Sequence, residues 1–448
     1  MTSKRHQILF TEGAVPKQLL AATLPMVWAI LALMSFNAAD TFFIAQLGEK
    51  PLAAITFTFP VVMVMSSIAI GLGAGTSTAV SQAIGVADQN LTKRLTTDAS
   101  SLCLILSLIF AAVGLLTIEP LFSLLGADDE LLPLIRQYME IWYLGLPGLI
   151  TPMVCMAAIR ANGMSKVQSY IMISSSLANI ALDPILIFGL LGAPRLELTG
   201  AALATIIVRY CTLFAALYMA RKVRMLTNPL ASLTLLGQSW KKILHVGLPA
   251  TATNVIIPLA TGVIVKLVAE HGTSAVAGFG IASRIEILAL VCFYALSSIV
   301  GPFFGQNMAA QKFERINQSL KTITQFNFAW GLLIALLLWL LAAPIAAQFN
   351  DSASVQAVTV AYLSIVPLSY GGYGLVMSIN AAFNGLAKPL PATLLSTSRV
   401  LILYLPLALL GQYLWGLNGL FIAAATANMI AAGIGYRWLK SSIHTATR

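Results

Sequence analysis

Two aspartates with amide neighbours are the residues of this chain whose types and spacing could do chemistry. Asp40 lies late in a long apolar stretch, and Asn37 precedes it by about one helical turn on the same face. A second apolar stretch carries Asn179 and Asp183, four residues apart and therefore also on one helix face. Carboxyl groups that lie close together in an apolar medium can hold a proton or a sodium ion, because their charges repel and are poorly solvated. The spacing thus predicts a cation-binding site that combines Asp40 and Asp183.

The elements that must position these side chains are membrane-spanning helices. Of the 448 residues, 58% are hydrophobic and 9% are charged, which is too little charge to cover a soluble domain of this length. Apolar stretches of about twenty residues recur along the whole chain, and each can cross a bilayer. Turn and charge signals predict an all-α membrane protein with twelve transmembrane helices, at 17–45, 52–82, 91–117, 131–156, 166–191, 198–220, 240–268, 274–304, 316–341, 354–380, 390–412 and 416–437.

Basic residues predict how these spans are oriented. With both termini in the cytoplasm, nineteen of the 26 lysines and arginines fall in cytoplasmic segments and three fall on the other face. Such a bias is typical of the inner side of membrane proteins. Cytoplasmic loops therefore explain the formal net charge of +10, and we expect no nucleic-acid partner.

The sequence contains no motif for metal binding, nucleotide binding or enzyme catalysis. The four cysteines lie in apolar stretches without metal-ligand spacing, and the four histidines are scattered. No phosphate-binding loop of the GxxxxGK[ST] type occurs, so an ion gradient or a separate partner must supply the energy for transport. We expect no enzyme activity, no organic cofactor and no metal, with Na+ at the aspartates as the one exception. A channel is less favoured than a transporter, because channels usually need several subunits around one pore.

The two halves of the chain match at a constant offset of 224 residues. Pro25 matches Pro249, Gly48 matches Gly272, and Tyr138 matches Tyr362. Residues 161–163 resemble 383–385, which implies a short deletion before that point. Six spans per half give both halves the same orientation, which predicts two parallel six-helix lobes with pseudo-twofold symmetry along the membrane normal. The predicted parts are an N-lobe at 1–220, a cytoplasmic linker at 221–239 and a C-lobe at 240–448, in a monomer.

Predicted depth brings further polar side chains to the two aspartates. Spans 1 and 5 run outward and spans 4 and 6 begin outside, so the same level holds Asp40, Asp183, Tyr138, Glu140 and Thr199. The second half instead carries charged residues to which the sequence assigns no role, namely Lys266, Arg284, Glu286 and Arg399. Methionine repacks around varied ligands, so a substrate cavity could be lined by Asn37, Met26, Met34, Phe36, Met63 and Met153.

The sequence resembles the multidrug and toxic compound extrusion (MATE) family, in its DinF-like branch, over about residues 15–440. The resemblance rests on Pro25, on the stretch 40–48, on the Asn-x-x-x-Asp-Pro motif at 179–184 and on 199–202. It implies a bacterial inner-membrane protein whose first-lobe cation site consists of Asp40, Asn179, Asp183, Thr199 and Tyr138. It also implies that Pro25 bends the first helix when this site is protonated. NorM-like members use acids in spans 7 and 10, where this chain has only Glu270, so coupling through the second lobe is not expected.

These features predict a secondary antiporter that exports lipophilic, often cationic, compounds in exchange for protons, with sodium as the alternative coupling ion. Its partners would be small-molecule drugs or toxic organic cations and the lipid bilayer. A flippase for lipid-linked oligosaccharides could share the parallel-lobe plan, and it would need a cationic cavity for pyrophosphate. The basic residues of the second half support that alternative, and the paired aspartates oppose it.

Overall fold

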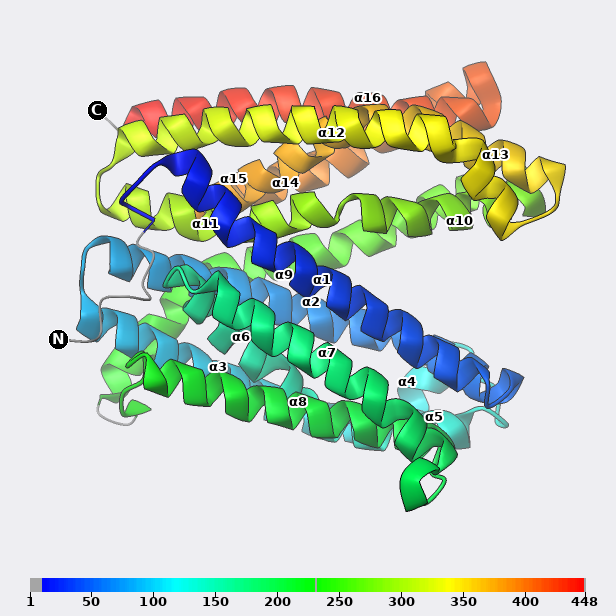
Figure 1. Ribbon diagram of the computed structural model, residues 1–448, viewed down its shortest axis with the longest axis horizontal. Helices are drawn as coiled ribbons and strands as arrows, with labels where there is room; N and C mark the ends of the chain where they lie inside the picture. Colours follow the sequence, from blue (N-terminus) through cyan, green and yellow to red (C-terminus); the bar gives the residue numbers. More distant parts are fainter. Residues whose placement is uncertain (1–9, 230–231, 447–448) are drawn as a thin grey trace. The chain divides into compact units, whose positions relative to one another are not determined.

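The computed structural model describes residues 10–229 and 232–446, and this part of the chain consists of helices joined by short turns (Figure 1). Its α-helices are α1 (Val15–Ala45), α2 (Glu49–Gly85), α3 (Gln89–Leu116), α4 (Ile118–Leu124), α5 (Leu132–Leu144), α6 (Leu146–Ala161), α7 (Ser165–Phe188), α8 (Glu197–Lys222), α9 (Leu233–Ala269), α10 (Thr273–Ala289), α11 (Val291–Ala309), α12 (Phe313–Phe349), α13 (Ala353–Ile365), α14 (Tyr370–Gly385), α15 (Pro389–Ser398) and α16 (Leu405–Ala446). Three short helical segments complete it, namely η1 (Leu190–Gly192), η3 (Val366–Ser369) and η4 (Arg399–Tyr404).

Long apolar helices account for the predicted twelve spans. Nine continuous stretches of the described residues are long and apolar enough to cross a membrane, and two further spans are bent pairs, α5 with α6 (42°) and α10 with α11 (46°). One of the nine, at Pro389–Thr445, has 57 residues. At about 1.5 Å per residue it is far longer than a bilayer core, and its backbone leaves helical geometry at Trp415 and Gly416. It therefore holds two spans, in agreement with the predicted division at 412–416.

The chain divides into two compact units. Among the described residues, unit 1 contains 24–251, and unit 2 contains 10–23 together with 252–446. Helix α1 therefore begins in unit 2 and continues in unit 1 from Leu24, next to Pro25. Helix α9 changes unit in the opposite sense after Thr251, two residues beyond Pro249. The two crossing points lie near the matched prolines of the repeat.

Left-handed backbone positions recur at the repeat offset. Residues with positive φ occur in pairs 224 residues apart, namely Gly48 (117°) with Gly272 (99°), Ala87 (59°) with Gln311 (56°), and Gly163 (77°) with Ala387 (54°). Helices α6 and α14 also begin and end 224 residues apart. The offset thus holds up to the start of α7 and α15, so the deletion inferred before residue 161 lies further along the chain.

Unit 1 depends on close contact between α2 and the first part of α9. A Cβ atom added at Gly75 would collide with the carbonyl oxygen of Ile243 and lie 2.9 Å from the amide nitrogen of Gly247. One turn away, a Cβ at Gly71 would collide with the side chain of Thr251. Small residues at these two positions let the helix backbones approach each other, as in other membrane helix pairs.

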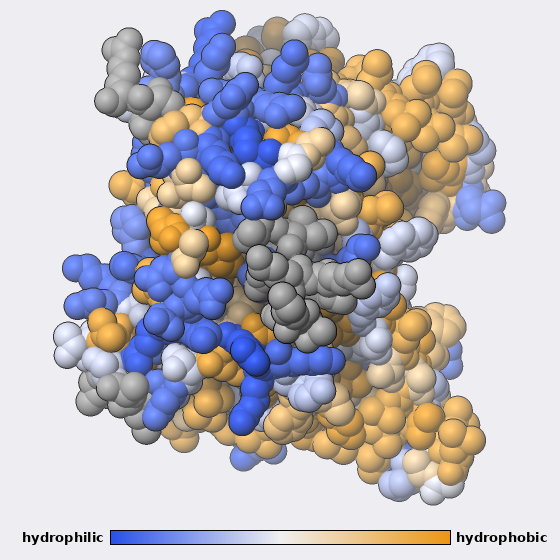
Figure 2. Space-filling view, turned by 60° about the vertical axis from the view of Figure 1, so that its left-hand side comes forward, coloured by the Kyte–Doolittle hydropathy of each residue, from blue (hydrophilic) through white to orange (hydrophobic). Residues whose placement is uncertain are grey.

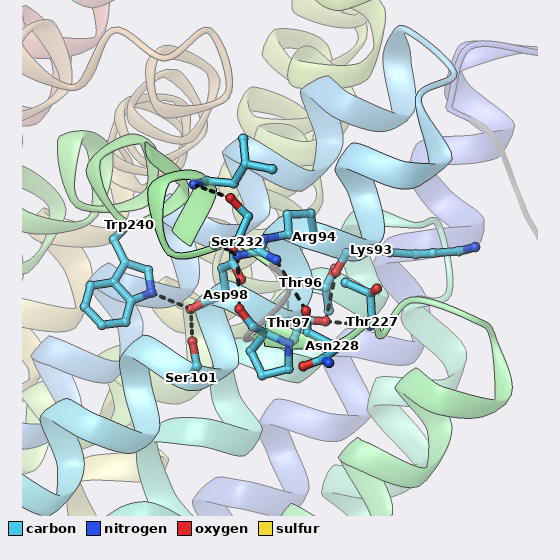
Figure 3. Close-up of polar contacts among 12 residues, drawn as sticks. Lys93, Arg94, Thr96, Thr97, Asp98, Ser101, Thr227, Asn228, Ser232 and Trp240 are labelled. Carbon is cyan, nitrogen blue, oxygen red and sulfur yellow. Dashed lines mark hydrogen bonds and ion pairs between the residues drawn. The ribbon is translucent and has the colours of Figure 1, made fainter. Parts of the chain in front are cut away.

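A buried ion pair anchors the linker to α3 in unit 1 (Figure 3). The Nε atom of Arg94 donates to Oδ2 of Asp98 at 2.7 Å, and the two side chains are 10% and 0% exposed. The guanidinium also donates to the carbonyl oxygens of Asn228 (3.3 Å), Pro229 (3.1 Å) and Ser232 (2.6 Å). Trp240 donates from Nε1 to the carbonyl oxygen of Asp98 at 2.9 Å. One arginine therefore satisfies several linker carbonyls that lack helical partners.

Unit 2 holds its own N-terminal segment in a similar way. Arg315, in the first turn of α12, donates to the carbonyl oxygens of Phe10 (2.9 Å) and Gly13 (2.6 Å). It also donates to the side-chain oxygens of Gln18 (2.9 Å) and Asn307 (3.0 Å).

Figure 2 shows hydrophilic side chains gathered over one end of the helices, with apolar side chains along their length. This distribution fits a protein whose helices are surrounded by lipid.

Candidate functional site

Asp183 and Asn179 form the buried part of the predicted site, on α7 of unit 1. Their side chains are 0% and 3% exposed, and the i,i+4 spacing puts them on one face of the helix. With its nitrogen turned toward the acid, the Asn179 amide donates to Oδ2 of Asp183 at 2.8 Å and to Oδ1 at 2.9 Å. The two residues therefore share one helix face, and the amide of one is hydrogen-bonded to the carboxylate of the other.

Asp40 lies on α1 and reaches the same region of unit 1. Its side chain is half-buried, and its Oδ1 atom is buried without a hydrogen-bond partner among the described residues. Asp40 interacts electrostatically with Asp183 and with Tyr138 of α5. Two acids and a phenol from three different helices thus lie within electrostatic range of one another. An unpaired buried carboxylate oxygen is costly, so this arrangement favours binding of a cation there.

Arg209 of α8 is a member of this group that the sequence did not predict. It interacts electrostatically with Asp40 and Tyr138, and its guanidinium carbon lies 5.0 Å from the ring centre of Trp142. Its Nη1 atom is buried without a partner among the described residues. The signal available in the sequence was an arginine inside an apolar span. Together, two acids and one arginine carry a formal charge of −1, which one proton or one Na+ would neutralise.

Two residues expected at the same depth have other partners. Thr199 accepts a hydrogen bond from Nε2 of Gln137 at 2.5 Å, next to Tyr138 in the chain, and among the described residues its hydroxyl does not hydrogen-bond either aspartate. Glu140 pairs with Arg136 at 2.8 Å, and that arginine also binds Glu119 at 2.6 Å. Both pairs are about half-exposed, so Glu140 belongs to a surface network and not to the site.

The expected hinge and cavity residues have varied surroundings. Pro25 lies within the continuous helix α1. Met26 is buried, and its sulfur accepts a hydrogen bond from the Ser169 hydroxyl at 3.5 Å. Met153 packs against the core of unit 1, whereas Met63 is 55% exposed. Of the remaining predicted lining residues, Asn37 is exposed, and the partly exposed ones are Met34 and Phe36.

A separate groove of about 510 Å³ lies between α7 and α8, which pack side by side (Figure 1). Its polar lining includes Ser175 and Thr212, whose hydroxyl oxygens are 2.6 Å apart, and the exposed Cys211. None of the predicted cavity residues lines it.

Comparison with known proteins decides the family. The family model MatE matches residues 25–185 and 249–410, which are most of the two halves of the chain. The chain belongs to the MatE family. Members of this family are membrane transporters and not enzymes, and they need no organic cofactor. The predicted family and the predicted absence of enzyme activity are confirmed.

Relatives of this MatE protein are named as transporters of more than one kind. It is 38% identical over 440 residues to a protein named "FAD transporter" of Shewanella oneidensis, covering 98% of this chain and 97% of the relative. It is 28% identical over 317 residues to "Multidrug export protein MepA" of Staphylococcus haemolyticus, covering 70% and 69%. The crystal structure of the Vibrio cholerae MATE transporter VcmN in the bent form matches with a TM-score of 0.92 and 32% identity, covering 97% of this chain and 98% of that one. The predicted fold class, with twelve helices in two lobes, is confirmed by these MATE structures.

Proposed function

We propose that this MatE transporter is a secondary antiporter, which exports small molecules as a cation enters through Asp40 and Asp183. The two moving lobes are residues 1–220 and 240–448, with 221–239 as the linker and both termini in the cytoplasm of a bacterial cell. In the outward-open state the aspartates take up the cation, and substrate leaves the first lobe. In the inward-open state the cation leaves and substrate enters. Pro25, one residue from the point where α1 changes unit, is the proposed hinge.

One observation carries this proposal: the partnerless Oδ1 atom of Asp40, near the fully buried Asp183. A buried carboxylate oxygen without a donor costs free energy until a proton or a cation reaches it. Binding therefore changes the stability of the arrangement around α1. The same α1 leads back to Pro25 and to the unit boundary, which gives the cation a physical route to the conformation.

The coupling ion that fits best is the proton. A sodium ion needs oxygen ligands, and the Asn179 amide instead turns its nitrogen toward Asp183. Thr199, the proposed hydroxyl ligand, is engaged by Gln137. A proton needs only one carboxyl oxygen and one acceptor, so Asp40 and Asp183 suffice with Tyr138 beside them.

The substrate we propose is a lipophilic, often cationic, small molecule, as the multidrug export names of several relatives suggest. The FAD transporter supports a second candidate, an anionic dinucleotide with a flat aromatic ring. The flippase alternative lacks comparable support: Lys266 and Arg284 are exposed, and Arg399 is engaged by Tyr373 and Asn428.

Transport by purified protein in liposomes tests the proposal. A fluorescent organic cation and a flavin dinucleotide are offered in turn, with a proton gradient or a sodium gradient of equal size. We expect the proton gradient to drive exchange in the wild type, and Asp40→Asn and Asp183→Asn to lose that dependence. Asp129→Asn, an exposed acid of the α4–α5 loop, is the matched control and keeps it. Undiminished proton-driven exchange in Asp40→Asn would contradict the site, and exchange driven by sodium alone would contradict the choice of ion.

A further inference from the structure

Unit 2 contains a carboxyl group that the sequence left without a role. Glu286 lies on α10 and is half-buried, and the hydroxyl of Tyr362, from α13, hydrogen-bonds its Oε2 atom. Tyr362 itself is only 6% exposed and belongs to the apolar core of the unit. We propose that Glu286 and Tyr362 form a second proton-binding site, distinct from Asp40 and Asp183. This goes beyond the proposed function, which assigns coupling to unit 1 alone.

The internal repeat supports the location of this site. Tyr362 matches Tyr138 at the offset of 224, and both tyrosines are 6% exposed and next to an acid. The acids themselves come from different helices. At the offset of 224, the unit 2 counterpart of Asp40 is Ile264, and the residues opposite Asp183, beyond the deletion, are apolar (405–407, Leu-Pro-Leu). Glu286 instead matches Val62 of unit 1. Unit 2 thus retains the buried phenol while its acid is on another helix.

Other titratable groups lie within electrostatic range of Glu286. From η4 these are Arg399 and Tyr404, from α11 Tyr294, and from α14 Tyr370. Tyr373 of α14 in turn interacts with Tyr294 and Tyr370. Arg399 forms no ion pair with Glu286 in the described part of the chain. It is held by the ring of Tyr373 and by Oδ1 of Asn428, to which it donates at 2.9 Å. The arginine therefore stays in place whether Glu286 is charged or neutral.

A second polar group in this cluster is free to respond to protonation. The hydroxyl of Tyr370 is fully buried and has no hydrogen-bond partner among the described residues. It lies within electrostatic range of Glu286 and of Tyr373. A phenol can donate to a carboxylate or accept from a carboxylic acid. Tyr362 and Tyr370 can therefore serve both forms of Glu286, which a purely structural carboxylate would not need.

Infrared difference spectroscopy of the purified protein between acid and alkaline pH tests this proposal without transport. A carboxyl group that takes up a proton gains a C=O stretching band, so we expect one band to be lost in Glu286→Gln. The band should remain in the double variant Asp40→Asn with Asp183→Asn. Tyr362→Phe, which changes one hydroxyl, should shift the frequency of the band, because the carbonyl loses a hydrogen bond. In a proton count by potentiometric titration, Glu286→Gln should release one proton fewer than the wild type.

The outcomes separate this proposal from the function proposed for unit 1. A wild-type spectrum that Glu286→Gln leaves unchanged, or a proton count that stays the same, overturns the second site and leaves Asp40 untouched. Undiminished proton-driven exchange in Asp40→Asn, together with a band that is lost only in Glu286→Gln, does the reverse: it overturns the site in unit 1 and supports the second site. Should Glu286→Gln fail to fold, as judged by size-exclusion chromatography, Tyr362→Phe provides the test in its place. An unshifted band in that variant then overturns the proposal.

Discussion

The anchor of the linker on α3 allows a prediction whose size follows from burial. Arg94→Ala would leave Asp98, which is fully buried, without its cationic partner. Breaking a buried ion pair by removing one partner costs about 3–5 kcal/mol, because an uncompensated charge remains in the interior. The three linker carbonyls that Arg94 serves would lose charge-assisted hydrogen bonds as well. We therefore expect Arg94→Ala to lower the free energy of unfolding by at least about 3 kcal/mol.

Arg136 provides the matched control, because it also pairs with two carboxylates. Its partners Glu119 and Glu140 are 63% and 47% exposed, so water screens both pairs. Exposed pairs contribute about 0–1 kcal/mol, and Arg136→Ala should cost no more than that. The expected gap of about 2–5 kcal/mol corresponds to roughly 30- to 4,000-fold in the unfolding equilibrium.

The assay is unfolding in mixed detergent and SDS micelles, followed by circular dichroism. A double-mutant cycle with Asp98→Asn adds a direct measure of the pair. Because Arg94 and Asp98 are in contact, the double variant should cost less than the sum of the single variants. Equal losses in Arg94→Ala and Arg136→Ala, or additive losses in the cycle, would refute the assignment of a stabilising anchor.

Two further predictions concern the packing of each unit. Gly75→Leu should destabilise unit 1 by more than the ~1–3 kcal/mol of ordinary overpacking, because its Cβ atom would collide with backbone atoms of α9. Gly433→Ala should be neutral or slightly stabilising, because a Cβ atom there meets nothing within 4 Å. The melting temperatures of the two variants check this, and equal values would contradict it. Arg315→Lys should loosen residues 10–18, because an ammonium group cannot replace the planar guanidinium that donates to both backbone and side-chain oxygens. Faster tryptic cleavage at Lys17 would show this loosening. Cleavage at the wild-type rate would contradict the proposal that Arg315 anchors this segment.

The spans could be predicted from sequence because hydropathy and length carry that information. The bends could not, because the apolar stretches continue through them: α5 and α6 are separated only by Gly145, and α10 and α11 only by Leu290. Nor could the sequence predict that α1 and α9 each belong to two units. That property depends on long-range contacts such as those of Gly75 with residues of α9.

The composition of the candidate site in unit 1 was partly predictable for a similar reason. Spacing on one helix indicated that Asn179 and Asp183 share a face, and predicted depth grouped them with Asp40 and Tyr138, which lie within electrostatic range of Asp183. Depth says nothing about the direction of a side chain around its helix, so it also grouped Glu140, which faces Arg136 at the surface. The same limit concealed Arg209, which reaches the site because α8 packs on α5 and α6.

Unit 2 shows why a comparison of the halves residue by residue misses chemistry. The unit 2 counterparts of Asp40 and Asp183 are apolar. A comparison of matched positions alone would therefore assign the second lobe no role in coupling. Yet α10 and α13 pack against each other, so a carboxyl group on α10 reaches the tyrosine that matches Tyr138. A duplicated fold keeps the space around this buried phenol, and any helix that borders the space can supply the acid. If Glu286 binds a proton there, each unit has a buried tyrosine beside a proton-binding carboxyl group, although the carboxyl groups occupy different positions in the repeat. Alternating access could then be coupled to one proton bound in each unit.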